Sequence, residues 1–333
     1  MGLKSLNRLE PTPRENSRPR LIKLAYDRSF FLVMRNPDYA RSVEAIIGSL
    51  MKDDIGAGDI TTDTLLASEK ATASIVAKES GVLAGGEEFA WLCNQNKIIV
   101  NPLKKDGGKF ETGDKLFELE GPKNSMFFVE RTGLNLLQRM SGIASETRRF
   151  ADILGKEGRC IVAATRKTPW GFLDKKAITL GGGHSHRLGL FESFLIKDNH
   201  IDALRNQKIK DPIAYAIDKA WEMRKRSVFI EIEARNLEEA VRAAERFKFL
   251  QEQAKEIKAC IVMLDNMSPQ AVRKTVNALR EKKFYDYVLL EASGNVNADN
   301  ILQYAKAGVD ACSLGCLTHS ARALDISQIL TKL

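Results

Sequence analysis

Apolar and polar residues follow two different periodicities along this chain, and the changes between them divide it into segments. Residues 39–51 place apolar side chains at helical spacing, and the turn Gly56-Ala57-Gly58-Asp59 ends that pattern. From residue 71 to 121, short alternating runs separated by glycines predict an antiparallel sheet. Residues 125–154 return to helical spacing and predict a long helix leading out of this sheet.

After residue 155, short β-rich runs alternate with amphipathic helices. We expect strands in six runs, at residues 160–164, 193–196, 228–232, 260–264, 287–290 and 310–314. Helix signals lie between them: Asn236 as an N-cap, Ser268-Pro269 as a start and Gly308 as an end. Alternating strands and helices indicate parallel strands with right-handed crossovers, and we predict an α/β barrel.

Polar or glycine residues follow the end of each predicted strand. They are cationic early, acidic in the middle and small at the end: Arg166 and Lys167, Lys197, Glu233, Asp265, Ser293-Gly294-Asn295, and Gly315 with His319. Because the loops after the strands carry the chemistry of such barrels, we expect these groups to share one rim. The alternative is that strand ends are polar because loops are solvated.

The candidate chemistry is that of an anion-binding site. Three of the four histidines lie between Thr165 and His200, in a window that also holds arginines, lysines and a glycine run. Such a set indicates a small, highly anionic substrate. The glycine-bearing last loops suit a phosphate held by backbone N–H groups. Glu233 and Asp265 suit Mg²⁺ holding a pyrophosphate, with a rim salt bridge as the alternative for each carboxylate.

Composition changes this picture little. The 333 residues are 44% hydrophobic and 28% charged, as in ordinary globular proteins, and no apolar run is long enough for a membrane span. The net charge is +8, of which residues 1–36 contribute eight basic minus three acidic residues, or +5. We therefore expect no nucleic-acid partner, with polyanion binding by this segment as the alternative. Five scattered cysteines indicate a reduced, cytoplasmic protein.

Several long motifs occur in one order along nearly the whole chain. They are ERTGLNLLQRMSGIA at 130–144, TRKT at 165–168, GGGHSHR at 181–187, LIKDNH at 195–200, EIE at 231–233, MLDNM at 263–267, LEASG at 290–294 and GCLTHS at 315–320. Together they closely resemble quinolinate phosphoribosyltransferase, the decarboxylating nicotinate-nucleotide pyrophosphorylase family. The resemblance extends from about residue 53 to residue 325.

The resemblance implies an N-terminal α/β sandwich domain beside an incomplete α/β barrel, in a homodimer in which each subunit completes the other's site. We expect a basic extension at 1–36, the sandwich domain at 37–146 and the barrel at 147–316. Residues 317–333 are expected to form a helical segment that returns to the sandwich domain. The sequence leaves open whether dimers assemble into a higher oligomer.

The resemblance also implies the substrates, quinolinate and phosphoribosyl pyrophosphate, and Mg²⁺ as cofactor. The implied quinolinate ligands are Arg166, His186, Arg187 and Lys197, with Arg131 reaching in from the neighbouring subunit. Lys167, Glu233 and Asp265 are the implied catalytic group, in which the two acids position Mg²⁺ and the ribose. The implied phosphate ligands are Ser293, Gly294, Asn295, Gly315 and His319.

Two departures from the family pattern keep alternatives open. After TRKT this chain has Pro169-Trp170-Gly171 and lacks an arginine that most members have, and Asn295 replaces a common glycine. One alternative is a related transferase for another heteroaromatic acid, as in a paralogous branch linked to molybdate transport. Another is a non-catalytic or nucleic-acid-associated paralogue, against which the intact polar residues count. A Rossmann dehydrogenase does not fit, because residues 181–183 form no GxGxxG motif.

Overall fold

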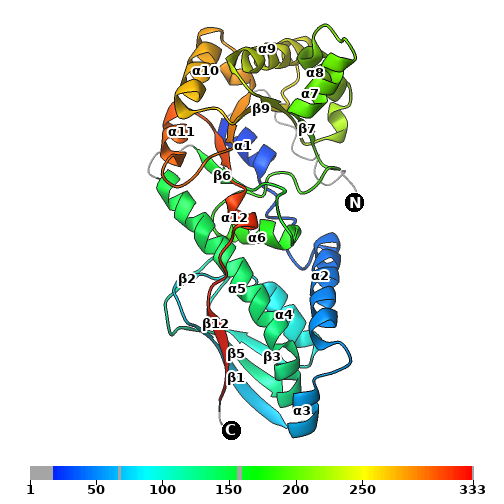
Figure 1. The fold of residues 1–333 in the computed structure, drawn as a ribbon, viewed down its shortest axis with the longest axis vertical. Coiled ribbons are helices and arrows are strands. Elements are labelled where there is room, and N and C mark those ends of the chain that lie inside the picture. Colours follow the sequence, from blue (N-terminus) through cyan, green and yellow to red (C-terminus); the bar gives the residue numbers. More distant parts are fainter. Residues whose placement is uncertain (1–17, 67–68, 156–159, 332–333) are drawn as a thin grey trace. The chain divides into compact units, whose positions relative to one another are not determined.

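The structure is a computed structural model that describes residues 18–66, 69–155 and 160–331. Its residues form two compact units, the barrel unit and the sheet unit (Figure 1). The barrel unit consists of the described parts of residues 18–28, 150–166 and 184–314. The sheet unit consists of those of residues 29–149, 167–183 and 315–331. Within the described residues, no helix has both the length and the apolarity needed to cross a bilayer.

The sheet unit is built on a four-stranded antiparallel sheet in the order β12-β1-β5-β3. The strands are β1 (Lys70–Ala77), β3 (Ile99–Pro102), β5 (Lys115–Pro122) and β12 (Ile326–Thr331), and β2 (Gly81–Val82) pairs with β4 (Lys109–Phe110). The helices are α2 (Pro37–Ile55), α3 (Ile60–Leu65), α4 (Gly86–Gln95), α5 (Lys123–Leu154) and α6 (Phe172–Leu180). The antiparallel sheet predicted for residues 71–121 is thus confirmed, and α5 is the predicted long helix.

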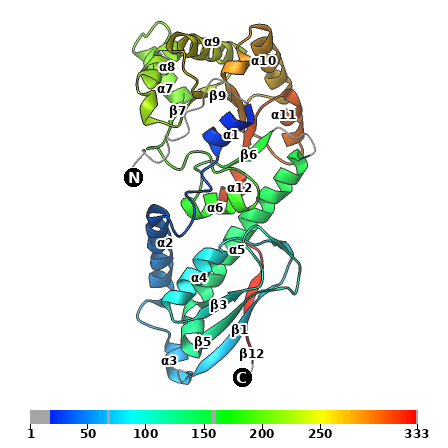
Figure 2. The same ribbon diagram turned by 180° about the vertical axis from the view of Figure 1, so that it is seen from behind.

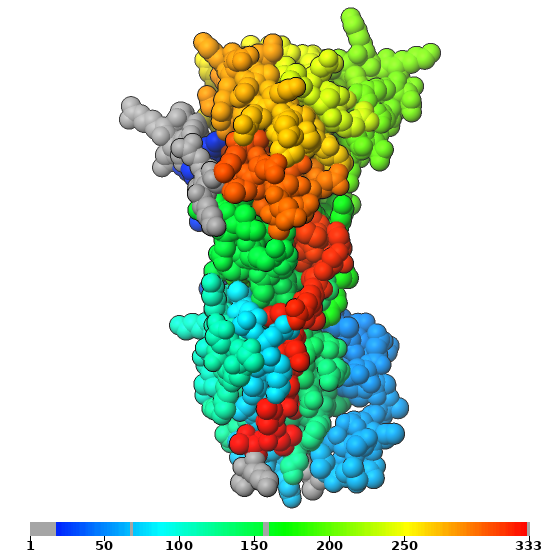
Figure 3. All heavy atoms as spheres, turned by 60° about the vertical axis from the view of Figure 1, so that its left-hand side comes forward, coloured from blue at the N-terminus to red at the C-terminus, as the bar shows by residue number. Residues whose placement is uncertain are grey.

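The C-terminal segment differs from its prediction. Helix α12 (Cys316–His319) is a single turn, and the expected helical segment at 317–333 is wrong, because residues 326–331 form β12. This strand pairs antiparallel with β1, where Ala73 is opposite Leu330. It lies at the surface of the sheet unit (Figure 3), and Ile329 is 46% exposed. The β1 residues that it pairs with lie about 250 positions away in sequence, so the pairing that makes this segment a strand is not visible locally.

The barrel unit contains a six-stranded parallel sheet in the order β6-β11-β10-β9-β8-β7. Its strands are β6 (Ile161–Ala163), β7 (Phe194–Ile196), β8 (Phe229–Ala234), β9 (Ala259–Asp265), β10 (Leu289–Ser293) and β11 (Ala311–Ser313). All six predicted strands are present, within a few residues of their expected ends. The first strand pairs with the last, and no pairing joins β6 to β7 in the described part of the chain. The prediction of an incomplete α/β barrel is confirmed.

Helices cover the outside of this sheet (Figure 2). They are α7 (Asp198–Asn206), α8 (Pro212–Glu222), α9 (Leu237–Ala254), α10 (Pro269–Glu281) and α11 (Ile301–Ala307). The predicted caps are confirmed: the Asn236 side chain accepts the Glu239 N–H at 2.9 Å, and Ser268 caps α10. Gly308, at φ 103°, ends α11 in the left-handed conformation that glycine adopts at least cost.

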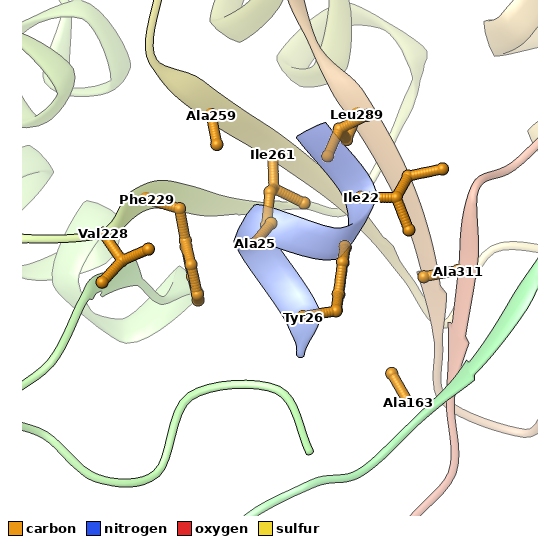
Figure 4. Packing of buried hydrophobic residues seen from close by; sticks show 10 residues of the cluster. All are labelled: Ile22, Ala25, Tyr26, Ala163, Val228, Phe229, Ala259, Ile261, Leu289 and Ala311. Carbon is orange, nitrogen blue, oxygen red and sulfur yellow. The ribbon is translucent and has the colours of Figure 1, made fainter. Parts of the chain in front are cut away.

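Helix α1 (Arg18–Tyr26) lies in the core of the barrel unit, which corrects the expectation of a separate basic extension at 1–36. Ile22, Ala25 and Tyr26 are buried at helical spacing and pack against apolar residues of the sheet (Figure 4). Those sheet residues include Ala163, Phe229, Ile261, Leu289 and Ala311. This helix has only nine residues, with three basic side chains among its apolar ones, so its signal in the sequence is weak. Residues 1–17 lie outside the described part of the chain.

Candidate active site

Alternation along the strands gives the barrel interior three layers. Side chains two residues apart on a strand point to the same face, so positions 229, 231 and 233 of β8 share the inner face, as do 289, 291 and 293 of β10. The first layer is the apolar cluster around α1. The second contains Glu231 and Glu291, and the third is the rim with Glu233 and Ser293. The polar rim therefore lies above a charged layer.

The second layer surrounds His186. This residue is 5% exposed, and its Nε2 lies 3.3 Å from a carboxylate oxygen of Glu231 and 3.3 Å from one of Glu291. Burial lowers the pKa of His186, but the two carboxylates more than offset this and raise it to about 9. The ring faces these core acids, so the expectation that it contacts quinolinate has no support here. The alternation of side chains along a strand places Glu231 and Glu291 in the interior, but the sequence does not show that His186 contacts them.

Two guanidinium groups lie near each other at the cationic part of the rim. Arg166 follows β6 and is exposed, whereas Arg187 is 5% exposed and donates from Nη1 to the Ser193 carbonyl at 2.9 Å. Burial, and then repulsion by Arg166, lower the pKa of the Arg187 guanidinium. Lys197, also exposed, follows β7, and its N–H donates to His200 Nδ1 at 2.9 Å. A dianion would relieve the repulsion between the two arginines.

The acidic part of the rim holds the two expected carboxylates. Glu233 accepts the Asp198 N–H at 3.1 Å, and Asp265 accepts from Asn266 Nδ2 at 2.7 Å. Burial raises the pKa of the Glu233 carboxyl, and the negative charge of Asp265 adds to this effect. The charge of Asp265 therefore acts on Glu233. Hard oxygen donors of this kind, close together and partly exposed, fit the ligand preference of Mg²⁺.

The loop after β10 is held in an unusual backbone conformation. Gly294 has φ 79°, and a Cβ at this position would lie 2.2 Å from the Asn266 side-chain oxygen, so only glycine fits. Asn295 has φ 56°, and its Nδ2 donates to that same oxygen at 3.2 Å. Asparagine tolerates this left-handed conformation, so the replacement of the common family glycine preserves the loop. Asn266, itself at φ 54°, is a structural partner of this loop that the sequence did not single out.

The remaining expected residues belong to the sheet unit. A Cβ at Gly315 would lie 3.0 Å from the His319 ring and 3.1 Å from Cδ of Lys167, so the structure brings these three residues together. The Thr318 hydroxyl donates to the Lys167 carbonyl at 2.7 Å and fixes the backbone of that lysine. Arg131 is exposed on α5. Sequence order alone assigned Lys167 to the barrel, but residues 167–183 pack with the sheet unit.

A hydrogen-bonded ion pair between Arg139 of α5 and Asp174 of α6 holds residues 167–183 in the sheet unit, and neither residue has a role predicted from the sequence. Arg139 also donates from Nη2 to the Thr318 carbonyl at 3.1 Å, and its guanidinium lies 5.2 Å from the centre of the Trp170 ring. Two residues after Asp174 on α6, Lys176 pairs at 2.5 Å with the buried Glu88. The Pro169-Trp170-Gly171 segment, a departure from the family pattern, is therefore anchored by contacts within the sheet unit.

Comparison with known proteins identifies the family. Residues 143–328 match the quinolinate phosphoribosyl transferase C-terminal domain, and residues 59–141 match the N-terminal domain of the same family. A probable nicotinate-nucleotide pyrophosphorylase [carboxylating] of Methanothermobacter thermautotrophicus is 37% identical over 286 residues, covering 85% of this chain and 96% of that protein. The nicotinate-nucleotide pyrophosphorylase [carboxylating] of Rattus norvegicus is 33% identical over 289 residues, covering 86% of this chain and 90% of that protein.

Solved structures give the same result. The nicotinate-nucleotide pyrophosphorylase of Francisella tularensis has a TM-score of 0.74 and 31% identity, covering 87% of this chain and 96% of that one. The nicotinate-nucleotide pyrophosphorylase of Ehrlichia chaffeensis has a TM-score of 0.73 and 32% identity, covering 86% of this chain and 98% of that one. On both domains and over most of its length, this chain belongs to the quinolinate phosphoribosyltransferase family, the phosphoribosyltransferases of NAD biosynthesis.

Proposed function

We propose that this protein transfers the phosphoribosyl group of phosphoribosyl pyrophosphate to quinolinate, giving nicotinate mononucleotide, pyrophosphate and CO₂. The observation that carries the proposal is the pair Arg166 and Arg187, two guanidinium groups near enough to repel each other, with Lys197 on the same rim. A cationic site of this kind is stabilised by a dianion, and quinolinate carries two adjacent carboxylates. A monocarboxylate such as nicotinate would compensate only part of the charge.

The cationic rim binds and orients the acceptor. A guanidinium pairs with a carboxylate through two parallel hydrogen bonds, which fixes the direction of the pyridine ring as well as its position. Each hydrogen bond to a charged group of this type contributes about 1.5–3 kcal/mol. With both carboxylates held, the ring nitrogen points toward the ribose carbon that it attacks. This positioning replaces a bimolecular encounter by a reaction between bound groups.

The acidic rim and the two phosphate loops bind the donor. Glu233 and Asp265 would hold Mg²⁺, which when bound neutralises charge on the pyrophosphate. The loop with Gly294 and Asn295 offers backbone N–H groups to the 5′-phosphate, and Gly315 with His319 offers a second set. Lys167, held through its carbonyl by Thr318, supplies a cation between the two substrates.

The chemical step needs no covalent intermediate with the protein. The bond between the ribose carbon and the pyrophosphate oxygen breaks, and the leaving group takes the electron pair. The pyridine nitrogen donates its lone pair to the resulting cation-like carbon. The carboxylate beside that nitrogen then leaves as CO₂, and its bonding pair stays on the ring carbon, stabilised by the positive nitrogen until a proton arrives. The protein contributes position and charge stabilisation.

The same proposal includes a homodimer in which Arg131 of each subunit reaches the site of the other. It also places the protein in the cytoplasm. An exposed arginine on a helix is available to a partner chain. All five cysteines are free thiols, and Cys160 Sγ lies 3.7 Å from Cys312 Sγ without a bond, which fits a reducing compartment.

An assay with phosphoribosyl pyrophosphate, Mg²⁺ and either quinolinate or nicotinate tests the proposal. We expect one CO₂ and one pyrophosphate per mononucleotide formed with quinolinate, and no turnover with nicotinate. Turnover with only another heteroaromatic acid would favour the related transferase, for which the Trp170 segment is the specific observation. An absence of turnover with every acid would contradict catalysis by this chain.

A further inference from the structure

The segment that precedes the family match contacts the loop that carries Arg187. The matched residues begin at 59, yet α1 lies in the core of the barrel unit (Figure 4). The Tyr26 carbonyl accepts the His186 N–H at 2.9 Å, and the Arg28 N–H donates to the Ser185 hydroxyl at 2.9 Å. Tyr26 at the end of α1 and Arg28 just after it are therefore hydrogen-bonded to the two residues just before Arg187.

Arg28 is a buried cation with a buried anionic partner. Its side chain is 2% exposed, and its Nε donates to Oε1 of Glu192, whose side chain is 0% exposed. The other guanidinium nitrogens donate to three carbonyls at the end of α1, those of Leu24 at 2.9 Å, Ala25 at 3.1 Å and Asp27 at 2.8 Å. A cation here satisfies carbonyls that have no partner within the helix. Removing Arg28 would leave the charge of Glu192 buried and without this partner.

Glu192 connects this cation to the Arg187 loop. Its second oxygen, Oε2, accepts the Leu188 N–H at 2.6 Å and closes the turn between residues 188 and 192. On the other side of Glu192, the Ser193 carbonyl accepts from Nη1 of Arg187 at 2.9 Å. Both the backbone after Arg187 and the acceptor of its guanidinium are thus fixed next to Glu192.

We propose that Arg28 is a positioning residue for the quinolinate subsite: through Glu192 it holds residues 187–193 so that the Arg187 guanidinium stays aligned with a carboxylate of the substrate. The inference rests on the proposed function and goes beyond it, because Arg28 lies ahead of the matched domains. Displacing a guanidinium by about 1 Å breaks its two-bond geometry, and the affinity for the dicarboxylate falls. Binding of the donor depends on other loops and is unaffected.

Arg18 provides the matched control. It is the first residue of α1, the helix that Arg28 follows by two residues. It pairs with Asp310 at 2.5 Å and donates to the Tyr285 carbonyl at 3.0 Å, away from the Arg187 loop. We expect Arg28→Met to raise KM for quinolinate about tenfold with KM for phosphoribosyl pyrophosphate changed less than twofold. Arg18→Met should leave both KM values unchanged. Arg28→Lys should recover part of the loss, because it keeps the charge but not the planar fork.

Amide hydrogen exchange over residues 185–193 gives a second readout that needs no catalysis. Arg28→Met should accelerate exchange in this segment, and Arg18→Met should not. Equal effects of the two variants, or equal rises in both KM values, would overturn the proposal. Should Arg28→Met fail to fold, Arg28→Lys and Glu192→Gln allow the same comparison. If the wild type did not turn over quinolinate, the proposed function would fail, while exchange would still decide whether Arg28 anchors the loop.

Discussion

Arg139 and Asp174 are joined by two parallel hydrogen bonds, from Nε at 2.9 Å and from Nη2 at 2.8 Å. The Asp174 side chain is fully buried, and that of Arg139 is 20% exposed. Because Arg139 is on α5 and Asp174 on α6, this pair attaches the segment that carries Lys167 to the long helix. The Thr168 hydroxyl donates to the same carboxylate, so the pair also fixes the residue after Lys167.

Arg139→Ala should lower the free energy of unfolding by about 3–5 kcal/mol, because it leaves the charge of Asp174 buried without its main partner. Chemical denaturation measures this change. Arg41→Ala is the control: its ion pair with Asp38 is exposed, and we expect a loss within about 0.5 kcal/mol. Equal losses of unfolding free energy in the two variants would show that the buried pair contributes no more to stability than the exposed one.

Arg187→Lys should weaken quinolinate binding about tenfold or more, since lysine keeps the charge but cannot form two parallel hydrogen bonds. Steady-state kinetics at saturating phosphoribosyl pyrophosphate gives the KM for quinolinate. Arg205→Lys, at an exposed pair with Asp202, should leave it unchanged. Equal quinolinate-dependent turnover in wild type and Arg187→Lys at low substrate would contradict the role of this arginine.

Glu233→Gln and Asp265→Asn should each raise the Mg²⁺ concentration needed for half-maximal activity by about tenfold, because a neutral amide oxygen is a weaker ligand for a hard cation. A magnesium titration of initial rates provides the measurement. Glu252→Gln, an exposed position that contacts Tyr287, serves as control. Unchanged magnesium dependence in both site variants would rule out these carboxylates as ligands.

The free energy of unfolding should fall as pH rises from about 6.5 to 9. The pKa of His186 is about 9 in the folded protein and 6.5 as its ordinary value, so the folded state binds more protons in this window. The stabilisation is complete below pH 6.5 and is lost by up to about 1.4 kcal/mol per pH unit above it. Denaturant titrations at several pH values should show this slope in wild type and, equally, in the control His200→Gln. A wild-type curve that is flat over the window would refute the assignment.

Mixing two inactive variants tests the shared site. In a homodimer with Arg131 acting across the interface, equal amounts of Arg131→Ala and Lys167→Ala give about half mixed dimers, each with one intact site, and about a quarter of wild-type activity returns. Subunits must first exchange, which size-exclusion chromatography of a tagged mixture verifies. If Arg131 acts within its own chain, every site in the mixture carries one of the two defects and no activity returns.

The amino-acid sequence by itself determined the elements and their order. Strand and helix periodicity, the caps at Asn236 and Ser268, and the polar groups after each strand are local properties, and parallel strands necessarily bring their carboxyl ends to one edge. This is why Glu233, Asp265 and Ser293 could be assigned to one rim in advance. The family motifs added the chemistry that is proposed for those groups.

Only the tertiary structure decided which distant residues meet. Three sets of contacts join residues that are far apart in the sequence: His186 with Glu231 and Glu291, Arg28 with Glu192, and β1 with β12. The separations range from 45 positions, for His186 and Glu231, to about 250 positions, for the two strands. Such contacts depend on how whole elements pack, and each participating residue looks locally like any other charged or apolar residue. Local periodicity therefore fixed the rim, whereas long-range packing set the orientation of the side chains that support it.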